Sequence, residues 1–250
     1  MERPFNENQL EGRNAVLEVL KSGRDIEKII VQKGNVEGTI RRIAGMAKER
    51  GIVVQEAARQ KLDEMSQTKN HQGVIAIVSE HEYAEVDDIL RSAAEKGEKP
   101  FIIILDNITD PHNLGAVIRT AECAGAHGVI IPKRRSVGLT AVVGKTSAGA
   151  LEYMPVARVT NIARTIEELK KQGVWVACAD MDGEDYYDAS LDGAIALVIG
   201  SEGEGVSRLV KEKCDFTVSI PMYGKISSLN ASVAGALLMY EVVRQRNYKD

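Results

Sequence analysis

The 250-residue sequence is 44% hydrophobic, which is enough to bury a core in one large domain or two modest ones. Its formal net charge of −4 gives no sign of the strongly basic surface that is typical of nucleic-acid-binding domains. No run of about 18 apolar residues is present, and the start of the chain is too charged for a signal peptide. We therefore expect a globular, cytoplasmic protein without membrane segments.

Apolar periodicity at the start of the chain predicts helices over residues 12–22 and 36–50. Three short apolar runs predict strands: KIIV, IVVQ and GVIAIV. We interpret residues 1–79 as a small α/β domain. Residues 81–100 then hold 3 Lys/Arg against 6 Asp/Glu, and this acidic stretch predicts a linker with an introductory helix over residues 80–98.

The remainder of the chain, residues 99–250, alternates apolar runs with helical stretches. The runs that predict strands are FIIIL (101–105), GVII (128–131), VWVACA (174–179), IALVIG (195–200) and FTVSI (216–220). The intervening segments that predict helices are 113–125, 140–149, 161–172, 205–213 and 228–246. Continuous apolar strands separated by helices indicate a parallel sheet covered on both faces, so we expect an α/β domain.

Cys123, Cys178 and Cys214 are odd in number and widely spaced, without a CxxC pair or a histidine at metal-ligand spacing. We expect three buried cysteines that behave as small hydrophobic residues, and neither a disulfide nor a zinc site. The four histidines likewise form no spacing typical of a metal site.

Ligands of open α/β sheets bind beyond the carboxyl ends of the strands, and three loops at such ends are rich in polar residues. The first is DNITDPHNLGAVIRTA, after the strand at 101–105. Asn113 in this loop is either a helix N-cap or a site residue. Arg119 lies on an otherwise small and apolar helix, so it either pairs with Glu122 at the surface or points into a site.

The second loop, GSEGEGVS, spaces its glycines G-x-x-G-x-G and carries two carboxylates. These charges would repel a phosphate, so the loop favours a ligand with hydroxyls, an amine or a cationic centre. The alternative is a tight turn before a helix. The third loop, PMYGKISSLN, places two hydroxyls and an amide before the last helix, where capping is the simplest explanation.

A basic cluster, Lys133-Arg134-Arg135, directly follows the strand GVII. It is either a solvated turn or a contact for a phosphate backbone.

Together the three loops resemble the signature motifs of the SpoU/TrmH family of RNA ribose 2′-O-methyltransferases, within the SPOUT superfamily. The motifs read DNITDPHNLGAVIRTA, ALVIGSEGEGVSRL and SIPMYGKISSLNASVAGALLMYEVVRQR, in the order and spacing of the family. The resemblance covers roughly residues 100–246. The segments EGRNAVLEVL and HQGVIAIV look like the small ribosomal-protein L30e-like domain of the branch that methylates guanosine in 23S rRNA.

The resemblance implies a C-terminal α/β trefoil-knot methyltransferase domain, with the cofactor S-adenosyl-L-methionine held in the knot and the active site completed across a homodimer. The implied substrate is structured RNA, bound in part by the N-terminal domain, and no metal is implied. The residues implied to hold the cofactor are Gly200, Ile220, Met222 and Leu229. The implied polar active-site residues are Asn113, Arg119, Glu202, Ser228 and Asn230.

We expect Arg119 to act on the target nucleotide electrostatically, because a guanidinium is almost never deprotonated in a protein. Three alternatives remain: a tRNA target, a non-catalytic RNA-binding ribosome assembly factor, and a nucleotide-binding oxidoreductase. The last is disfavoured because the loop after FIIIL lacks the glycine fingerprint of a dinucleotide site.

Overall fold

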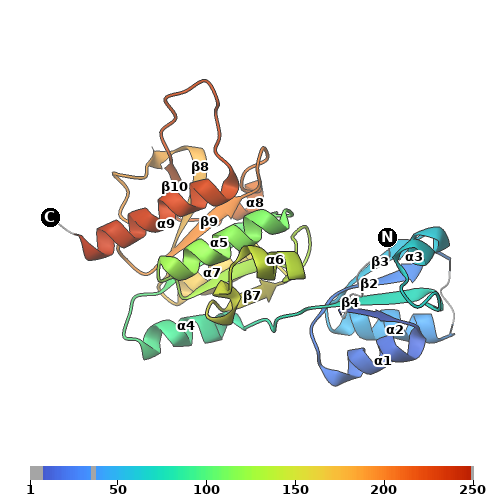
Figure 1. The fold of residues 1–250 in the computed structure, drawn as a ribbon. Coiled ribbons are helices and arrows are strands. Elements are labelled where there is room, and N and C mark those ends of the chain that lie inside the picture. The colour runs from blue at the N-terminus through green and yellow to red at the C-terminus, as the bar shows by residue number, and fades with distance from the viewer. Residues whose placement is uncertain (1–7, 35–37, 249–250) are drawn as a thin grey trace. The chain divides into compact units, whose positions relative to one another are not determined.

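The computed structural model of the chain describes residues 8–34 and 38–248, which form two compact units (Figure 1). The first unit ends at Glu82 and the second begins at Tyr83. Each is a separate α/β domain with its own core. No helix in the described part of the chain is long and apolar enough to cross a membrane.

The N-terminal domain has a four-stranded sheet in the order β1-β4-β2-β3. Its strands are β1 (Gln9–Glu11), β2 (Ile26–Gln32), β3 (Val53–Ala57) and β4 (Val74–Val78). Its helices are α1 (Arg13–Ser22), α2 (Gly38–Glu49) and α3 (Arg59–Met65). The strands and helices predicted from the sequence are present, except that residues 36 and 37 of the second predicted helix lie outside the described residues. The sequence did not predict β1 or α3.

The C-terminal domain has a six-stranded sheet in which every pair of neighbouring strands is parallel. In spatial order the strands are β10 (Phe216–Ser219), β8 (Trp175–Asp185), β9 (Ile195–Gly200), β5 (Phe101–Asp106), β6 (Gly128–Pro132) and β7 (Val156–Val159). The predicted parallel α/β fold is therefore confirmed. The sequence did not predict β7, an edge strand in which two of the four residues are only partly buried.

Helices cover both faces of this sheet, so the strands in its middle are buried on two sides. One face packs against α5 (Pro111–Cys123), α6 (Ala141–Thr146) and α9 (Ala231–Asn247). The other packs against α4 (Val86–Glu95), α7 (Ile162–Lys171) and α8 (Arg208–Lys211). A 3₁₀ turn, Ala150–Glu152, follows α6. Figure 1 shows α5 and α9 side by side on one face.

Strand β8 is longer than the predicted 174–179 and contains a wide irregularity. In its pairing with β10, Cys178 lies opposite Thr217, whereas the next pair joins Glu184 to Val218. The intervening residues 179–183 therefore leave the ladder and form a bulge. Gly183 ends this bulge where a Cβ would lie 2.6 Å from the carbonyl carbon of Thr217, so only glycine fits without a backbone shift.

Candidate cofactor and active site

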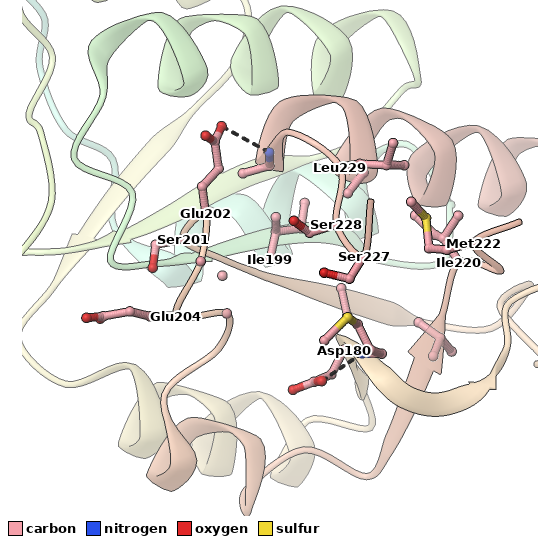
Figure 2. Close-up of a pocket in the computed structure, with 18 residues that line it drawn as sticks. Asp180, Ile199, Ser201, Glu202, Glu204, Ile220, Met222, Ser227, Ser228 and Leu229 are labelled. Atoms are coloured by element: carbon pink, nitrogen blue, oxygen red, sulfur yellow. Dashed lines mark hydrogen bonds between the residues drawn. The ribbon is translucent and has the colours of Figure 1, made fainter. Parts of the chain in front are cut away.

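A cavity of about 330 Å³ opens at the carboxyl ends of β9 and β10 (Figure 2). Its walls are the β8 bulge, the loop that follows β9 and the chain between β10 and α9. All four residues that the resemblance assigned to the cofactor line it: Gly200, Ile220, Met222 and Leu229. Glu202 and Ser228, from the second set of candidate residues, line it as well.

The loop after β9, residues 200–207, which we call the glycine loop, closes on itself tightly. The amide of Ser201 donates to the carbonyl of Gly205 at 3.2 Å, and the amide of Gly205 donates back to Ser201 at 2.9 Å. A Cβ on Gly200 would lie 2.1 Å from the carbonyl carbon of Gly205. The close approach explains the glycine at position 200, and it turns the backbone of the loop towards the cavity.

A buried carboxylate at the end of β5 also supports the loop. Asp106, at the end of β5 and only 5% exposed, accepts a hydrogen bond from the amide of Ser207 at 2.8 Å. Ser207 is the N-cap residue of α8, so this bond satisfies one of the free amides at the start of that helix. Asp106 thus connects the central strand to the chain that leaves the glycine loop.

The β8 bulge is held in place by one lysine. Lys211 Nζ lies 2.9 Å from Asp180 Oδ2 and 2.6 Å from Asp182 Oδ1. Its hydrogen bonds to the two carboxylates raise the pKa of Lys211. The bond between Lys211 and Asp182 lowers the pKa of Asp182. Since Asp180 and its neighbour Met181 both line the cavity, this pair of contacts fixes one of its walls.

Three polar side chains from distant parts of the sequence meet beside the cavity. Asn113 Nδ2 donates to Glu202 Oε1 at 2.9 Å, and Asn230 Nδ2 donates to Asn113 Oδ1 at 3.0 Å. Asn230 Nδ2 also donates to Glu202 Oε1. The same oxygen accepts a hydrogen bond from the amide of Ala231 at 3.4 Å (Figure 2). We call Asn113, Glu202 and Asn230 the polar triad. It ties the first turn of α5, the glycine loop and the start of α9 together.

The two helices of the polar triad begin at residues other than those the sequence suggested. Asp110 caps α5, because its side chain accepts from the amide of His112 at 3.0 Å, and Asn113 lies within the first turn. Asn230 caps α9 and accepts from the amides of Ser232 and Val233. The prediction that α9 begins at residue 228 was therefore wrong, and it is not a cap role that explains Ser228.

Figure 2 shows where the remaining candidate side chains lie. Ser227 and Ser228 line the same side of the cavity, next to Leu229, whereas Glu204 points away from them. The sequence did not single out Ser201 or Asp180, and it noted Ser227 only as one of the two hydroxyls before the last helix. Asp180 could have been recognised, because it directly follows the apolar run VWVACA in the same way as Asp106 follows FIIIL.

Arg119 lies apart from these residues, exposed on α5. Among the described residues it has no hydrogen bond or ion pair, so the alternative of a surface pair with Glu122 is wrong. It does not line the cavity. The structure therefore brings together Asn113, Glu202 and Asn230, with Ser228 nearby in the cavity wall, but not Arg119.

A second, open groove of about 600 Å³ lies where α5 meets α9. Three large side chains of α9 line it and face solvent: Val233 is 47% exposed, Leu237 40% and Tyr240 51%. Because the opposite side of α9 packs against the sheet, this helix is apolar on two sides. Such an apolar face on the surface is typical of an interaction site.

The cysteines differ in part from the sequence expectation. Cys178 is buried and Cys214 is half-buried, but Cys123 at the end of α5 is exposed, so its predicted burial was wrong. Within residues 8–34 and 38–248, no group of three or more His, Cys, Asp or Glu side chains is arranged to hold a metal ion.

Comparison with protein families gives two matches in this chain. Residues 100–240 match the model of the SpoU rRNA Methylase family. Residues 9–84 match the model described as RNA 2′-O ribose methyltransferase substrate binding. The first match lies within the C-terminal unit, and the second covers most of the N-terminal unit and ends two residues beyond it.

Curated relatives match over nearly the full length. A putative TrmH family tRNA/rRNA methyltransferase of Bacillus subtilis, YacO, is 54% identical, and the match covers 94% of this chain and 95% of the relative. A putative TrmH family tRNA/rRNA methyltransferase of Staphylococcus haemolyticus is 51% identical, with the same coverage.

Solved structures match the fold. The SpoU methyltransferase AviRb from Streptomyces viridochromogenes, in complex with the cofactor AdoMet, is 25% identical with a TM-score of 0.60, covering 95% of this chain and 90% of AviRb. An AdoMet-bound rRNA methyltransferase from Sinorhizobium meliloti is 25% identical with a TM-score of 0.60, covering 96% of this chain and 88% of the other.

Proposed function

Because the chain belongs to the SpoU rRNA Methylase family, we propose that it transfers a methyl group from S-adenosyl-L-methionine to a ribose 2′-hydroxyl of structured RNA. The observation that carries the proposal is the meeting of the three polar loops at one edge of the C-terminal sheet, beside the cavity. The same proposal places the reaction in the cytoplasm.

The chemistry of the cavity suits this cofactor. Its lining includes the carboxylates of Asp180, Glu202 and Glu204 but no lysine, arginine or histidine. A ligand that carries a sulfonium and an ammonium group is attracted to such a lining, whereas a nucleotide polyphosphate is repelled. Apolar side chains such as Ile199 and Ile220 supply surface for an adenine ring. S-adenosyl-L-methionine would supply an activated methyl group there.

Methyl transfer requires mainly that the ribose oxygen be held in line, at roughly 3 to 3.5 Å from the methyl carbon. The polar triad keeps the glycine loop and the start of α9 in one arrangement, so Asn113, Glu202 and Asn230 act as positioning residues. Ser228 offers a hydroxyl in the cavity wall. Arg119 binds the target nucleotide, where its guanidinium polarises the 2′-hydroxyl or holds an adjacent phosphate.

We propose that a second copy of the chain covers the groove between α5 and α9. The supporting observations are the exposed apolar side chains of α9 and the position of Arg119, which lies outside the cavity of its own chain. A homodimer would complete the site with residues of both copies. Leu237→Glu should give a monomer in light scattering, because an exposed carboxylate would be buried in the interface. A dimer that persists unchanged would refute this arrangement.

The central test is methyl transfer from radiolabelled S-adenosyl-L-methionine to ribosomal RNA and, separately, to tRNA. Arg119→Ala should lower kcat by a factor of about 100 or more while cofactor affinity stays the same, because the residue does not line the cavity. Glu122→Gln, a change at an exposed position of the same helix that lines neither the cavity nor the groove, serves as the control. Near-normal turnover of Arg119→Ala would contradict the assigned role.

The target within RNA is the finer part of the proposal. We favour a guanosine of 23S rRNA, with residues 1–79 as an RNA-binding domain that is linked through residues 80–98 to a methyltransferase domain over 99–250. The substrate-binding family model over residues 9–84 supports such a role. Comparing ribose methylation in total RNA of a deletion strain and its parent would identify the nucleotide. A mark lost from tRNA instead would redirect the proposal.

A further inference from the structure

The stretch between Glu122 and Glu152 contains no acidic residue, although the whole chain has 36 Asp/Glu and only 32 Lys/Arg. The stretch does contain four lysines and arginines: Lys133, Arg134, Arg135 and Lys145. With four cations and no acid, the stretch carries a local positive charge within a chain that is acidic as a whole. The first three of these cations form the loop that follows β6, which we call the basic loop (Lys133–Arg135).

The basic loop is anchored at both ends but leaves its charges free. The amide of Lys133 donates to Val159 at 2.8 Å, and the amide of Val137 donates to the carbonyl of Ile108 at 3.0 Å. Between these anchors Arg134 and Arg135 are exposed. Neither guanidinium has a hydrogen bond or ion pair with any side chain that the structure describes.

The basic loop lies at the same ends of the strands as the cavity. Strand β5 lies between β6 and β9. The basic loop follows the carboxyl end of β6, the chain leading to α5 follows that of β5, and the glycine loop follows that of β9. With neighbouring strands about 4.8 Å apart, the end of β6 is about 10 Å from the end of β9. The bond from Val137 to Ile108 joins the basic loop to the chain that leads into the polar triad at Asn113.

The backbone of Arg135 is also unusual, with φ at 57°. Only a few per cent of residues other than glycine adopt a positive φ, and an arginine gains nothing from it locally. The two anchors flank this residue, so the backbone places Arg134 and Arg135 at the carboxyl end of β6.

We propose that the basic loop binds the phosphate backbone of the RNA strand next to the nucleotide that is methylated. Arg134 and Arg135 would contact phosphates and so place the ribose at the cavity mouth without reading the base sequence. This inference rests on the proposed RNA substrate, and it assigns the strand a path from the cavity, past α5, to the carboxyl end of β6. The partner is the sugar–phosphate chain and not a free phosphate or an acidic protein.

The test compares three double variants of the full chain. Arg134→Ala/Arg135→Asn removes both charges, and asparagine tolerates the positive φ of position 135. Arg134→Lys/Arg135→Lys keeps the charges. Lys96→Ala/Lys171→Ala is the matched control. These lysines lie at the ends of α4 and α7, which lead into the amino ends of β5 and β8, and the basic loop lies at the carboxyl ends of the strands.

Binding of a 23S rRNA transcript should be measured as a function of salt concentration, with and without turnover. Removing two phosphate contacts should weaken binding about ten- to thirty-fold near physiological salt and make the slope of log K against log salt shallower by about two. The lysine variant and the control should keep the slope. The charge-removing variant should raise KM for RNA far more than it lowers kcat, and titration should show unchanged S-adenosylmethionine affinity.

The outcomes separate the inference from the proposed function. Wild-type affinity and salt slope in the charge-removing variant would overturn the basic loop as a phosphate site, whether or not the protein methylates RNA. An equal loss in the control would overturn it too, since any surface charge would then have the same effect. RNA binding that depends on the loop, without methyl transfer to any RNA by the wild type, would support the loop and refute the activity.

Discussion

Replacing Asn230 tests the structural claim on which the site depends most. Its side chain does two things at once: Oδ1 caps α9, and Nδ2 donates to Asn113 and Glu202. Asn230→Ala removes both functions. Asn230→Asp keeps a capping oxygen, since aspartate is as good an N-cap as asparagine, but replaces the donor by a carboxylate oxygen that faces Glu202.

The two variants should lose a similar free energy of unfolding for different reasons. In Asn230→Ala, the lost cap costs about 1 kcal/mol and the lost hydrogen bond to Glu202 about another 1 kcal/mol at this exposed position. In Asn230→Asp the cap remains, but the bond is lost and two carboxylates about 4 Å apart repel by roughly 1 kcal/mol in a solvated site. We expect a loss of about 2 kcal/mol in each.

A second substitution distinguishes the two causes. Glu202→Gln should recover about 1 kcal/mol or more in the Asn230→Asp background, because it removes the repulsion and supplies an amide donor. It should recover nothing with Asn230→Ala. Urea unfolding at one fixed protein concentration, followed by the fluorescence of Trp175, the single tryptophan, reports on the C-terminal domain. Wild-type stability of Asn230→Asp, or no rescue by Glu202→Gln, would refute the role of the polar triad.

Three further changes probe the glycine loop and the two domains. Gly200→Ala should weaken S-adenosylmethionine binding by roughly tenfold or more in calorimetry, since the new Cβ would lie 2.1 Å from Gly205; unchanged affinity would contradict this. Burial lowers the pKa of His127 despite a hydrogen bond to a glutamate, so unfolding free energy should fall as pH drops below about 6.5; His127→Asn should abolish this dependence in Trp175 fluorescence. Burial raises the pKa of Glu11, but hydrogen bonds from neighbouring residues outweigh it and lower the pKa to about 2. The stabilisation is therefore present above about pH 4.5 and lost as pH falls towards 2; Glu11→Gln should cost about 1 to 2 kcal/mol at neutral pH, seen as faster hydrogen exchange in the N-terminal domain.

The strands that the sequence predicts best are those buried on both faces. FIIIL and IALVIG are continuous apolar runs because β5 and β9 lie in the middle of the sheet, with helices above and below. Edge strands lack this constraint. The four residues of β7, VARV, include an arginine and follow a proline, so no run of apolar residues marks them.

Helix starts are harder to predict where several residues compete for one cap. Asp110 and Asn113 both suit the start of α5, and Ser227, Ser228 and Asn230 all suit the start of α9. The choice depends on tertiary contacts: Asn230 is held by Asn113, 117 positions away in the sequence. Local sequence contains no trace of such a partner.

In the site, too, local sequence predicts some features, while others depend on tertiary contacts. Its loops could be located from the sequence, because polar residues at the carboxyl ends of buried strands are conspicuous. The contacts that join them could not be, since the polar triad depends on residues from three separate loops. Lys211 is a further example, because a lysine at the end of a short helix gives no local indication that it holds two aspartates of another strand.

The β8 bulge has a consequence for how the cavity can diverge among related chains. Residues 179–183 form part of its wall, yet they lie outside the strand ladder, which resumes at Glu184. A residue can be inserted or deleted there without moving the side chains of either flanking segment to the other face of the sheet. Such a change within an ordinary strand would turn its core residues towards solvent. The bulge therefore allows the ligand pocket to change its outline through evolution while the sheet that supports it keeps its register.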